Sequence, residues 1–577
     1  MILQALVNLY ENLVKSEKVS RQGWCKAKVS YAIHLSKEGT VTGILSLKKE
    51  EDRGKKKVLV PIQQDVPEMV TRSSGVAANF LCDNSKYILG IEKDGVTESA
   101  MDRFSAAREK HLELLQELDD ETAQAVCLFF KTWDPRTAKE NREISENWEE
   151  LTEGGNLVFF FDEQFAQDRP AICEAWEKSK NISSGQQGIC LVTGEKTEIS
   201  RIHKSIKGVP GAQSSGAALV SFNAPSFESY GKEQSYNAPV GKYAEFAYTT
   251  ALNYLLSQND YNFQLGDSRI VFWAESGEEA YQDLFLWAAD SKPDNEEELK
   301  NFFNHLKKQE AVDVHGITLD PEQKFYILAL APNAARLSVR FFYANSFGNI
   351  MKNLSEHYDR LRMIKPAWET REYLGVRDLL FETVNKKAKE KTPISGMAAM
   401  VLQAILSGNR YPESLFTDTL IRIRAEQGEV TWGRASILKA YFIRNKNWEK
   451  GENFMELNYE EKESKAYVLG RLFAVLESVQ TDANPGINAT IRDRYFNSAC
   501  ASPAMVFPIL IKLKNSHMKK LERENAGVKI RYEQLLTEII GKLGMEFPRR
   551  LSLEDQGKFI LGYYHQIQKK CEKKEDK

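Results

Sequence analysis

A basic segment between residues 204 and 216 combines features that bind phosphate groups. Lys204 and Lys207 supply positive charge, and glycines at positions 208, 211 and 216 space the residues that follow. Because glycine has no Cβ, backbone N–H groups in such a loop can approach an anion closely. The polar side chain of Gln213 lies among them. These residues predict an anion-binding loop.

The next segment, residues 221–240, is a polar stretch bracketed by two Asn-Ala-Pro units. It is rich in aromatic, amide and hydroxyl side chains and holds a single lysine, Lys232. A packing strand shows an unbroken apolar alternation, which this segment lacks. Gln234 and Asn237 add amide groups near the lysine. We therefore interpret the segment as a surface that binds rather than as part of a core.

A second polar loop covers residues 66–79. It contains, in order, Arg72, Ser73, Ser74, Gly75 and Asn79. Arginine, serine and asparagine side chains can contact base edges or phosphates, and Gly75 permits close backbone approach. The alternative is an ordinary turn whose Ser and Asn side chains cap the next element. A strand is expected to follow at Phe80-Leu81.

Arg336 and Arg340 lie four residues apart beyond Pro332-Asn333. At that spacing two side chains project together from a helix and from a regular strand alike. Two arginines on one face suit a phosphate or a carboxylate, because each guanidinium can donate parallel hydrogen bonds. Pairing with acidic residues of the same chain is the alternative.

Composition limits the class of protein. With 577 residues, 42% of them hydrophobic, two or three domains are expected. The formal net charge of −3 argues against an even coat of positive charge, but nucleic-acid binding depends on local patches. Seven scattered cysteines without a C-x-x-C pair predict a reduced cytoplasmic protein with no structural zinc, and no cofactor is expected. No apolar run approaches the ~18 residues of a membrane span.

Several elements are expected to position these loops. Residues 1–14 predict an amphipathic helix rather than a signal peptide. Val29, Tyr31, Ile33 and Leu35 predict one face of a β-hairpin whose turn covers residues 36–40. The charged run 48–57 is expected to be a solvated loop. Periodicity predicts helices over residues 98–133 and 242–256, and strands over 156–162, 268–274 and 325–331.

From residue 347 onward helical periodicity dominates. Residues 465–479 present an apolar stripe, and Ser502-Pro503 is a typical helix start. Pro508 is expected to kink that helix or delay its start. Residues 455–577 are therefore interpreted as a compact helical bundle. This segment holds 21 Lys and Arg against 17 Asp and Glu, so basic charge is in excess at this end.

Motifs for catalysis are lacking in the sequence. The stretch 190–197 ends in Gly-Glu-Lys-Thr, but a P-loop needs G-x-x-x-x-G-K-[ST], and both glycine positions are filled by other residues. There is no H-E-x-x-H, no His/Cys zinc spacing and no G-x-S-x-G elbow. A metal-dependent nuclease built from dispersed carboxylates stays open as an alternative function.

Residues 190–256, together with 72–75, 79–84 and 331–341, resemble the large subunit of the type I-C CRISPR surveillance complex, Cascade (the Csd-type family). The similarity touches the start, middle and end of the chain. It implies an α+β protein with a mixed α/β N-terminal domain and an all-helical C-terminal bundle. The implied domains are a DNA-recognition domain over 1–345, a helical connecting region over 346–454 and a small-subunit-like bundle over 455–577.

The resemblance implies a non-catalytic subunit of an antiviral ribonucleoprotein. Such a subunit recognises the protospacer-adjacent motif (PAM) in duplex DNA, promotes unwinding and R-loop formation, and gives a surface to a recruited helicase-nuclease. The expected residues for reading the motif and opening the duplex are Arg72, Ser73, Ser74, Gly75, Asn79 and Asn84. The expected residues for the DNA backbone are Lys204, Lys207, Gln213, Lys232, Gln234, Asn237, Arg336 and Arg340.

The implied partners are double-stranded target DNA, its displaced strand, and the CRISPR RNA-bound backbone and RNA-end-binding subunits. A separate small subunit made by internal initiation is also implied, and Met455 stands where it would start. Lys450-Gly451-Glu452 can be encoded by a purine-rich ribosome-binding sequence two codons upstream. A third possible function is a purely structural scaffold, in which removing Arg72 or Lys232 leaves DNA affinity unchanged.

Overall fold

The computed structural model describes residues 2–53, 56–70, 72, 75–180, 185–290, 301, 303, 312–314, 317–446, 464–544 and 546–571. The chain divides into two compact units, which we call the first and second units. The first comprises Met1–Lys204 and Val220–Tyr254, and the second comprises Ser205–Leu219 and Leu255–Lys577. The predicted domain boundary after residue 345 falls inside the second unit, and the one after residue 454 lies outside the described residues.

A six-stranded sheet centred on β1 (Trp24–Leu35) organises the first unit. The first half of β1 pairs antiparallel with β4 (Lys56–Pro67), and its second half pairs antiparallel with β2 (Val41–Ser46). Its other edge pairs parallel with β5 (Asn156–Phe161). β3 (Lys48–Arg53) extends the sheet beyond β4, and β6 (Gln164–Phe165) extends it beyond β5. The predicted hairpin and the predicted strand near 156–162 are confirmed.

The prediction of a solvated loop over residues 48–57 is wrong. Residues Lys48–Arg53 form β3, which pairs in antiparallel register with β4. The run of charged residues does not prevent a strand here, because an edge hairpin meets water and charged side chains protect such edges from aggregation. The described residues of the charged run thus belong to the sheet, and residues 54 and 55 lie outside the described residues.

The predicted single face of β1 is interrupted by a bulge. The register against β5 shifts between Val29 and Tyr31. As a result Val29 packs in a small cluster with Val66 and Val158, whereas Tyr31, Ile33 and Leu35 enter the main core of the first unit. A bulge reverses the direction of the side chains that precede it, and simple alternation cannot reveal it.

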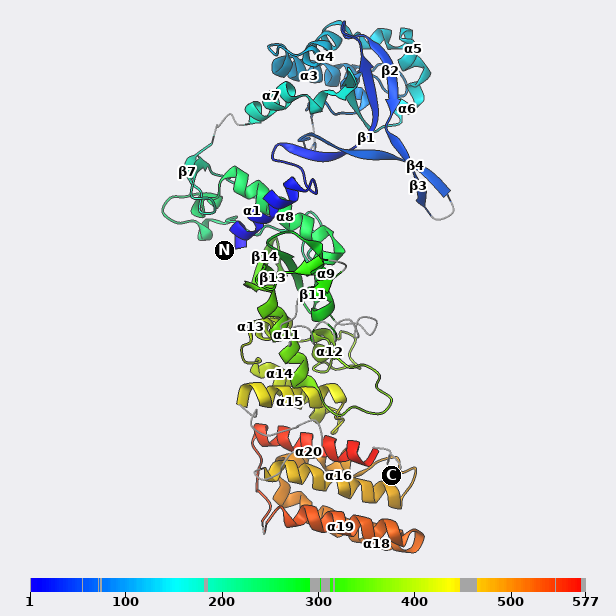
Figure 1. Cartoon of the computed structure of the whole chain (residues 1–577), viewed down its shortest axis with the longest axis vertical. Coiled ribbons are helices and arrows are strands. Elements are labelled where there is room, and N and C mark those ends of the chain that lie inside the picture. Colours follow the sequence, from blue (N-terminus) through cyan, green and yellow to red (C-terminus); the bar gives the residue numbers. More distant parts are fainter. Residues whose placement is uncertain are drawn as a thin grey trace. The chain divides into compact units, whose positions relative to one another are not determined.

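Six helices pack around the sheet of the first unit within the described residues. They are α2 (Ser85–Ile88), α3 (Glu98–Leu115), α4 (Glu121–Thr132), α5 (Arg142–Glu146), α6 (Trp148–Thr152) and α7 (Pro170–Lys180). In Figure 1, α3 and α4 lie side by side next to β1 and β2. The helix predicted over 98–133 is two helices, because Asp120 starts α4 by accepting a hydrogen bond from the Ala123 N–H. Buried rings of Phe129, Phe130 and Phe159 fill the core between helix and sheet.

Two further helices and several short elements complete the first unit. α1 (Ile2–Lys15) is amphipathic, as predicted, and its Tyr10 makes edge-on ring contacts with Tyr243 and Phe246 of α8 (Lys242–Ser257). The short elements are 3₁₀ helices η1 (Pro135–Glu140), η2 (Ala166–Asp168), η3 (Pro225–Phe227) and η4 (Gln234–Asn237), and the hairpin β7 (Gln187–Ile189) with β8 (Lys196–Glu198). This hairpin occupies the stretch that carries the incomplete P-loop pattern.

The second unit begins with a four-stranded antiparallel sheet. Its order is β14 (Arg336–Ser346), β13 (Lys324–Asn333), β10 (Ser268–Ala274) and β9 (Asn262–Leu265). Rings of Phe272, Phe285 and Phe325 lie in mutual contact where α9 (Glu279–Ala289) covers the sheet. η5 (Asn259–Tyr261) and the hairpin β11 (Val312–Val314) with β12 (Ile317–Leu319) flank it. The strands predicted at 268–274 and 325–331 are confirmed.

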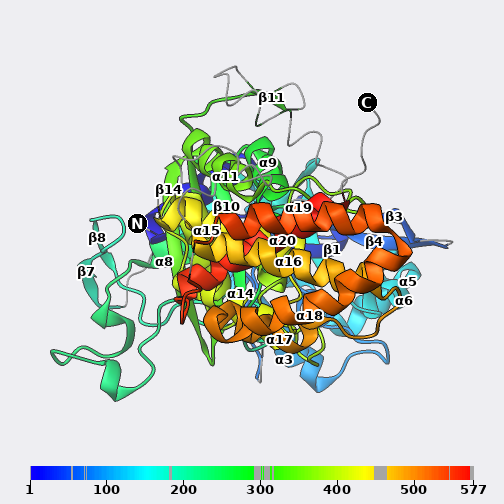
Figure 2. The same cartoon turned by 90° about the horizontal axis from the view of Figure 1, so that it is seen from below.

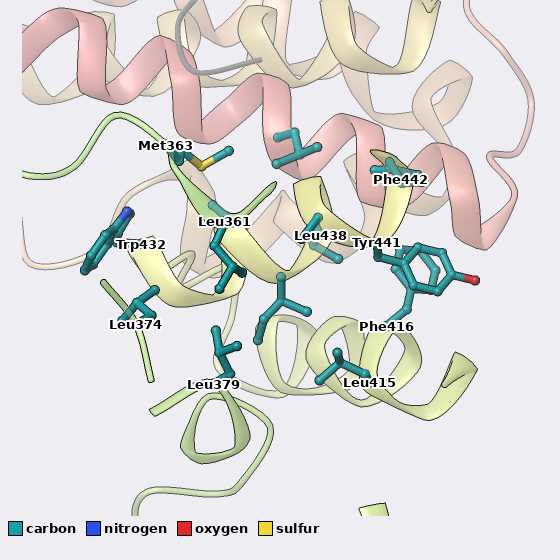
Figure 3. Close-up of a cluster of buried hydrophobic side chains, with 14 of the residues drawn as sticks. Leu361, Met363, Leu374, Leu379, Leu415, Phe416, Trp432, Leu438, Tyr441 and Phe442 are labelled. Carbon is teal, nitrogen blue, oxygen red and sulfur yellow. The ribbon is translucent and has the colours of Figure 1, made fainter. Parts of the chain in front are cut away.

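Helices follow the sheet, as predicted for the chain after residue 347. The first five are α11 (Phe347–Leu361), α12 (Val376–Phe381), α13 (Met397–Ser407), α14 (Glu413–Ala425) and α15 (Trp432–Lys446). Figure 3 shows Leu379, Phe416 and Leu438 converging from α12, α14 and α15. Phe416 stacks on Tyr441 with ring centroids 4.4 Å apart. The sheet and these helices share one continuous core.

The last helices are α16 (Lys465–Ala483), α17 (Ile491–Ala501), α18 (Pro503–Glu524), α19 (Ala526–Gly541) and α20 (Leu553–Cys571). The predicted helix over 465–479 and the helix start at Pro503 are confirmed, and Pro508 lies inside α18. α16 and α20 run side by side in Figures 1 and 2. The α+β class, with a helical C-terminal region, is confirmed. Within the described ranges, no helix combines the length and apolar character needed to cross a membrane.

Candidate nucleic-acid interface

Arg72 is held inside the first unit by a buried carboxylate. Its Nη1 donates to Asp83 Oδ1 at 3.0 Å, its Nη2 contacts Asp83 Oδ2, and its Nε donates to Ala77 O at 2.7 Å. The guanidinium also lies 4.0 Å from the centre of the Tyr87 ring. The Asp83 side chain is only 1% exposed, so the carboxylate of this ion pair is shielded from water. Arg72 therefore fixes the path of the loop that carries it.

Asp83 connects this loop to the sheet. Its carboxylate also accepts hydrogen bonds from the Asn79 and Asn84 N–H groups, each at 2.9 Å. Its backbone exchanges two hydrogen bonds with Leu157 of β5. One carboxylate thus gathers two backbone donors and one arginine, as expected for a buried charge that must be fully hydrogen-bonded.

The other expected motif-reading residues divide between the interior and the surface. Asn79 is buried and accepts a hydrogen bond from the Val70 N–H at 2.9 Å, whereas Asn84 caps the start of α2 through the Lys86 N–H at 3.1 Å. Gly75 is exposed, has a φ of 85° and would meet no atom within 4 Å if it carried a Cβ. Ser73 and Ser74 lie outside the described residues. The loop therefore exposes its main chain at Gly75, whereas the side chains of Asn79 and Asn84 accept hydrogen bonds from backbone N–H groups of the same unit.

The strand predicted at Phe80-Leu81 is wrong. Leu81 has a φ of 58°, and its N–H donates to Nε2 of His111 at 2.9 Å rather than to a neighbouring strand. Because Nε2 accepts, the ring proton lies on Nδ1, which is 2.7 Å from Ala107 O. Burial lowers the pKa of His111 to about 3, so the ring stays neutral near pH 7. The neutral imidazole anchors the chain just after the loop of residues 66–79.

Lys204 lies on the first unit among acidic and aromatic neighbours. Its Nζ is 2.9 Å from Glu68 Oε1 and 4.8 Å from the centre of the Phe246 ring. Its backbone N–H donates to Glu245 Oε1 at 2.6 Å. Burial raises the pKa of Glu245, and the contacts with Lys204 oppose that rise. About half of the Lys204 side chain is exposed, so it can reach an anion only by competing with Glu68.

Asn237 supports the turn that carries Lys232. Its Oδ1 accepts from the Ser229 N–H at 2.9 Å, and its Nδ2 donates to Lys232 O at 2.6 Å and Gln234 O at 2.9 Å. Gln234 in turn accepts from Arg201 Nε at 2.8 Å. The side-chain amides of Gln234 and Asn237 hold this loop in shape. Of the residues of this loop that we expect to contact the DNA backbone, Lys232 is the exposed one.

The remaining expected residues belong to the second unit. In the loop 205–219, the exposed Lys207 and Gln213 lie near a pairing of Ile206 with Ala217. A Cβ on Gly216 would come within 2.7 Å of Ser205, so glycine is needed for this close approach. Ala218 pairs with Arg336 at the start of β14. The structure therefore brings this loop and Arg336 together in one place.

Arg340 pairs with an acidic residue of its own unit. Its Nη2 lies 3.0 Å from Asp267 Oδ2 and 3.2 Å from Ser395 Oγ. Partial burial opposes ionisation of Asp267, but hydrogen bonds from Ser395 and Ser268 and the charge of Arg340 lower its pKa below the usual value. Leu330 pairs with Val339 and Ala329 with Phe341, so Arg340 is the extra residue of a bulge. The regular alternation expected to align it with Arg336 is interrupted.

Sequence reasoning missed the two residues that stand out most in these loops. Asp83 was not a candidate, because nothing in the sequence shows which carboxylate an arginine will meet. Tyr230 was not a candidate either, although it is 98% exposed. The signal that could have found it is an aromatic residue directly before Gly231 in a polar stretch, because glycine favours turns and a turn exposes the side chain beside it. The DNA contacts assigned to the expected residues stay predictions.

Metal or pocket chemistry is not apparent in the described part of the chain. There, no three His, Cys, Asp or Glu side chains are placed to hold a metal ion together. A cavity of about 680 Å³ in the first unit is lined by side chains of both charges. Arg21 in its wall lies 3.1 Å from Glu177 and 4.3 Å from the centre of the Trp24 ring. The cavity wall holds four basic and three acidic side chains.

Comparison with known proteins shows a family match over nearly the whole chain. A family model described as CRISPR-associated protein (Cas_Csd1) matches residues 6–571. No curated protein matches the chain. The family match spans both compact units and includes every residue singled out above.

Proposed function

The chain belongs to the Cas_Csd1 family of CRISPR-associated proteins, and from this premise we propose that it is the large, non-catalytic subunit of an RNA-guided Cascade complex. In this proposal the subunit recognises the PAM in duplex DNA, promotes unwinding and R-loop formation, and offers a surface to a helicase-nuclease. The family match over residues 6–571 carries the proposal.

The loops of both units support DNA contact by their exposure and chemistry. Lys207, Gln213 and Lys232 are exposed, and Gly75 presents bare backbone. Lysines hold phosphates and set the register on the duplex, while backbone and amide groups can reach base edges. Arg72, Asn79, Asn84 and Asn237 would act indirectly, by holding these loops in shape.

Motif recognition would be coupled to strand opening. Guide pairing supplies sequence specificity, and the protein reads only a short motif and the shape of the backbone. Exchanging the DNA duplex for an RNA–DNA heteroduplex changes the free energy little. Modest protein contacts beside the motif can therefore shift the equilibrium toward the heteroduplex. A subunit that grips the duplex through several short loops suits this task.

The helical C-terminal region would offer a path for the displaced strand. Exposed basic residues follow one another along α18, at Lys512, Lys519, Lys520 and Arg523. Lys512 and Lys519 make no ion pair with any carboxylate of the described residues. A basic track of this kind binds single-stranded DNA with little sequence preference. This region would also contact the neighbouring subunits of the complex.

Omitting the chain from the complex tests the proposal. We expect a guide-loaded complex without it to bind single-stranded target but to lose binding to the double-stranded target, since pairing with the guide then has no assisted opening. Equilibrium titration of both targets measures this. Equal binding of the duplex with and without the chain contradicts the proposal and favours a structural scaffold.

A nuclease assay tests the alternative enzyme. The purified chain is incubated with single- and double-stranded DNA in Mg²⁺ or Mn²⁺, and products are resolved on a denaturing gel. We expect intact DNA with either metal. Cleavage that follows the chain through successive purification steps would replace the proposed role with a metal-dependent nuclease that uses dispersed carboxylates.

A further inference from the structure

Tyr230 is presented at the tip of a tight turn. Its side chain is 98% exposed, and the Lys232 N–H donates to Ser229 O at 3.1 Å to close the turn. Tyr230 and Gly231 have φ values of 53° and 66°, as in a type I′ turn. That turn favours Asn-Gly, because a bulky residue with positive φ is strained. Tyrosine therefore occupies a position that turn geometry alone would give to asparagine.

The turn is held firmly by its neighbours. Asn237 accepts from the Ser229 N–H and donates to Lys232 O, so its side chain spans the base of the turn. The Gln234 N–H donates to Glu228 Oε1 at 3.1 Å. A strained residue that gains no packing in return, on a loop so well supported, is typical of a binding site.

The surroundings of the ring favour a nucleobase over a protein surface. Anchor residues of protein interfaces lie in apolar patches that exclude water. The neighbours of Tyr230 along the chain are instead polar or charged, namely Glu228, Ser229, Gly231, Lys232 and Glu233; of the two carboxylates, Glu228 accepts the Gln234 N–H and Glu233 lies 3.8 Å from Arg201. A free aromatic face suits stacking on a base, which every base allows, and the exposed Lys232 two residues away suits the adjoining phosphate.

We propose that Tyr230 stacks on an unpaired nucleobase of the bound DNA. The inference rests on the proposed function and adds a residue and a mode of contact to it. The ring would cover a base that has lost its neighbour where the duplex opens or where a strand is displaced, while Lys232 contacts the phosphate beside it.

Four variants separate the ring from the turn. Tyr230→Asn removes the ring but suits the turn, whereas Tyr230→Phe and Tyr230→Trp keep an aromatic face. Trp368→Ala removes an aromatic side chain of the second unit that is 77% exposed. Guide-loaded complexes are titrated with target duplex, and the same complexes are irradiated on duplexes that carry 5-iododeoxyuridine at single positions around the motif.

We expect Tyr230→Asn to weaken duplex binding by about 5- to 100-fold, the range of one stacked base. Tyr230→Phe, Tyr230→Trp and Trp368→Ala should bind as the wild type does, and a cross-linked peptide should contain residue 230. Wild-type binding by Tyr230→Asn, with no cross-link at residue 230, overturns the inference and leaves the proposed function intact. Loss of complex assembly in Tyr230→Asn would also overturn it, because the ring would then contact protein. If the wild-type complex does not bind the duplex, both the inference about Tyr230 and the proposed function are contradicted.

Discussion

At the residue scale, Asp83 shows how one buried carboxylate shapes a candidate DNA-contacting surface. It accepts from Nη1 and Nη2 of Arg72 and from two backbone N–H groups. The arginine most suited by chemistry to read a base is therefore the residue that holds the loop. Its effect on DNA binding would come through the position of Gly75 and its neighbours.

Arg72→Ala is expected to destabilise the first unit by about 3 kcal/mol, because it leaves the buried Asp83 charge without its partner. Chemical denaturation followed by fluorescence measures the change. Arg108 is an exposed arginine of the same unit, and Arg108→Ala should alter stability by no more than about 0.5 kcal/mol. Equal stability of the two variants would show that the pair is not important for the fold.

Buried histidines predict a loss of stability in acid. Burial lowers the pKa of His111 and His357 to about 3 and of His203 to about 4, from an ordinary value of 6.5. Between these values and pH 6.5 the unfolded chain binds more protons than the folded one. Stability is therefore full above pH 6.5 and falls as the pH drops below it.

At pH 5 each of these histidines should cost about 2 kcal/mol relative to pH 7.5. Thermal melts at several pH values measure the trend. Replacing His357 with Asn should flatten the pH dependence, because one of the buried neutral rings is then absent. A melting temperature that stays constant from pH 7.5 to 5 would contradict the burial of neutral rings.

Sequence predicted the chemical types of the loop residues but not their partners. Arg72, Asn79 and Asn237 are polar residues in loops, as expected. Their hydrogen bonds to Asp83, Val70 and Ser229 join positions that only the fold brings together. The rival interpretation of Asn as a capping or turn residue describes Asn79 and Asn84 well, because short amides commonly satisfy backbone groups at such sites.

At the element scale, two glycines let α16 and α20 pack with their backbones almost touching. A Cβ added at Gly470 would lie 1.9 Å from Phe559 O, and one at Gly562 would lie 2.0 Å from Tyr467 O. Both obstacles are backbone atoms, which no side-chain rotation can move. The two helices can keep this spacing only if both positions are glycine.

Gly470→Ala and Gly562→Ala should each destabilise the second unit by about 3 kcal/mol, because the added methyl group forces the helices apart. Gly541 at the end of α19 has no atom within 4 Å of the same position. Gly541→Ala should be neutral or slightly stabilising, since alanine is the better helix former. Denaturation curves of the three variants check this, and similar curves for all three would rule out the close packing.

Most elements were within reach of sequence analysis, and the exceptions have physical causes. α16 was found because an apolar stripe repeats over several turns, and α18 was found from its Ser502-Pro503 start. β3 was missed because its run of charged residues is typical of a solvated loop. Its strand structure depends on pairing with β4, which the sequence pattern does not show. The bulges at Val29 and Arg340, and the positive φ of Leu81, follow from tertiary contacts that leave no periodic trace.

At the scale of the whole molecule, charge is divided unevenly along a chain with a formal net charge of −3. The segment from residue 455 has a basic excess, and Met455 itself lies outside the described residues. We expect that segment to be made also as a separate product. A C-terminally tagged chain should then give a second, shorter band.

Met455→Ala should remove the shorter band and leave the full-length chain, because initiation needs the start codon. Met505→Ala, which alters another methionine of the same segment, should leave both bands. Immunoblotting of cell extracts and mass spectrometry of the band's first peptide measure the result. A shorter band that persists in Met455→Ala would show that it arises by proteolysis or from another start.

The most direct measurement is an equilibrium titration of the guide-loaded complex on target duplexes that differ only in the flanking motif. A matched pair of targets with the strands already separated by mismatches serves as control. Binding to closed duplexes should depend strongly on the motif, by about 1–3 kcal/mol for each base that the protein can no longer read, and the dependence should weaken on the opened pair. Equal affinity for closed duplexes with and without the motif would contradict the proposed role of this chain in DNA recognition.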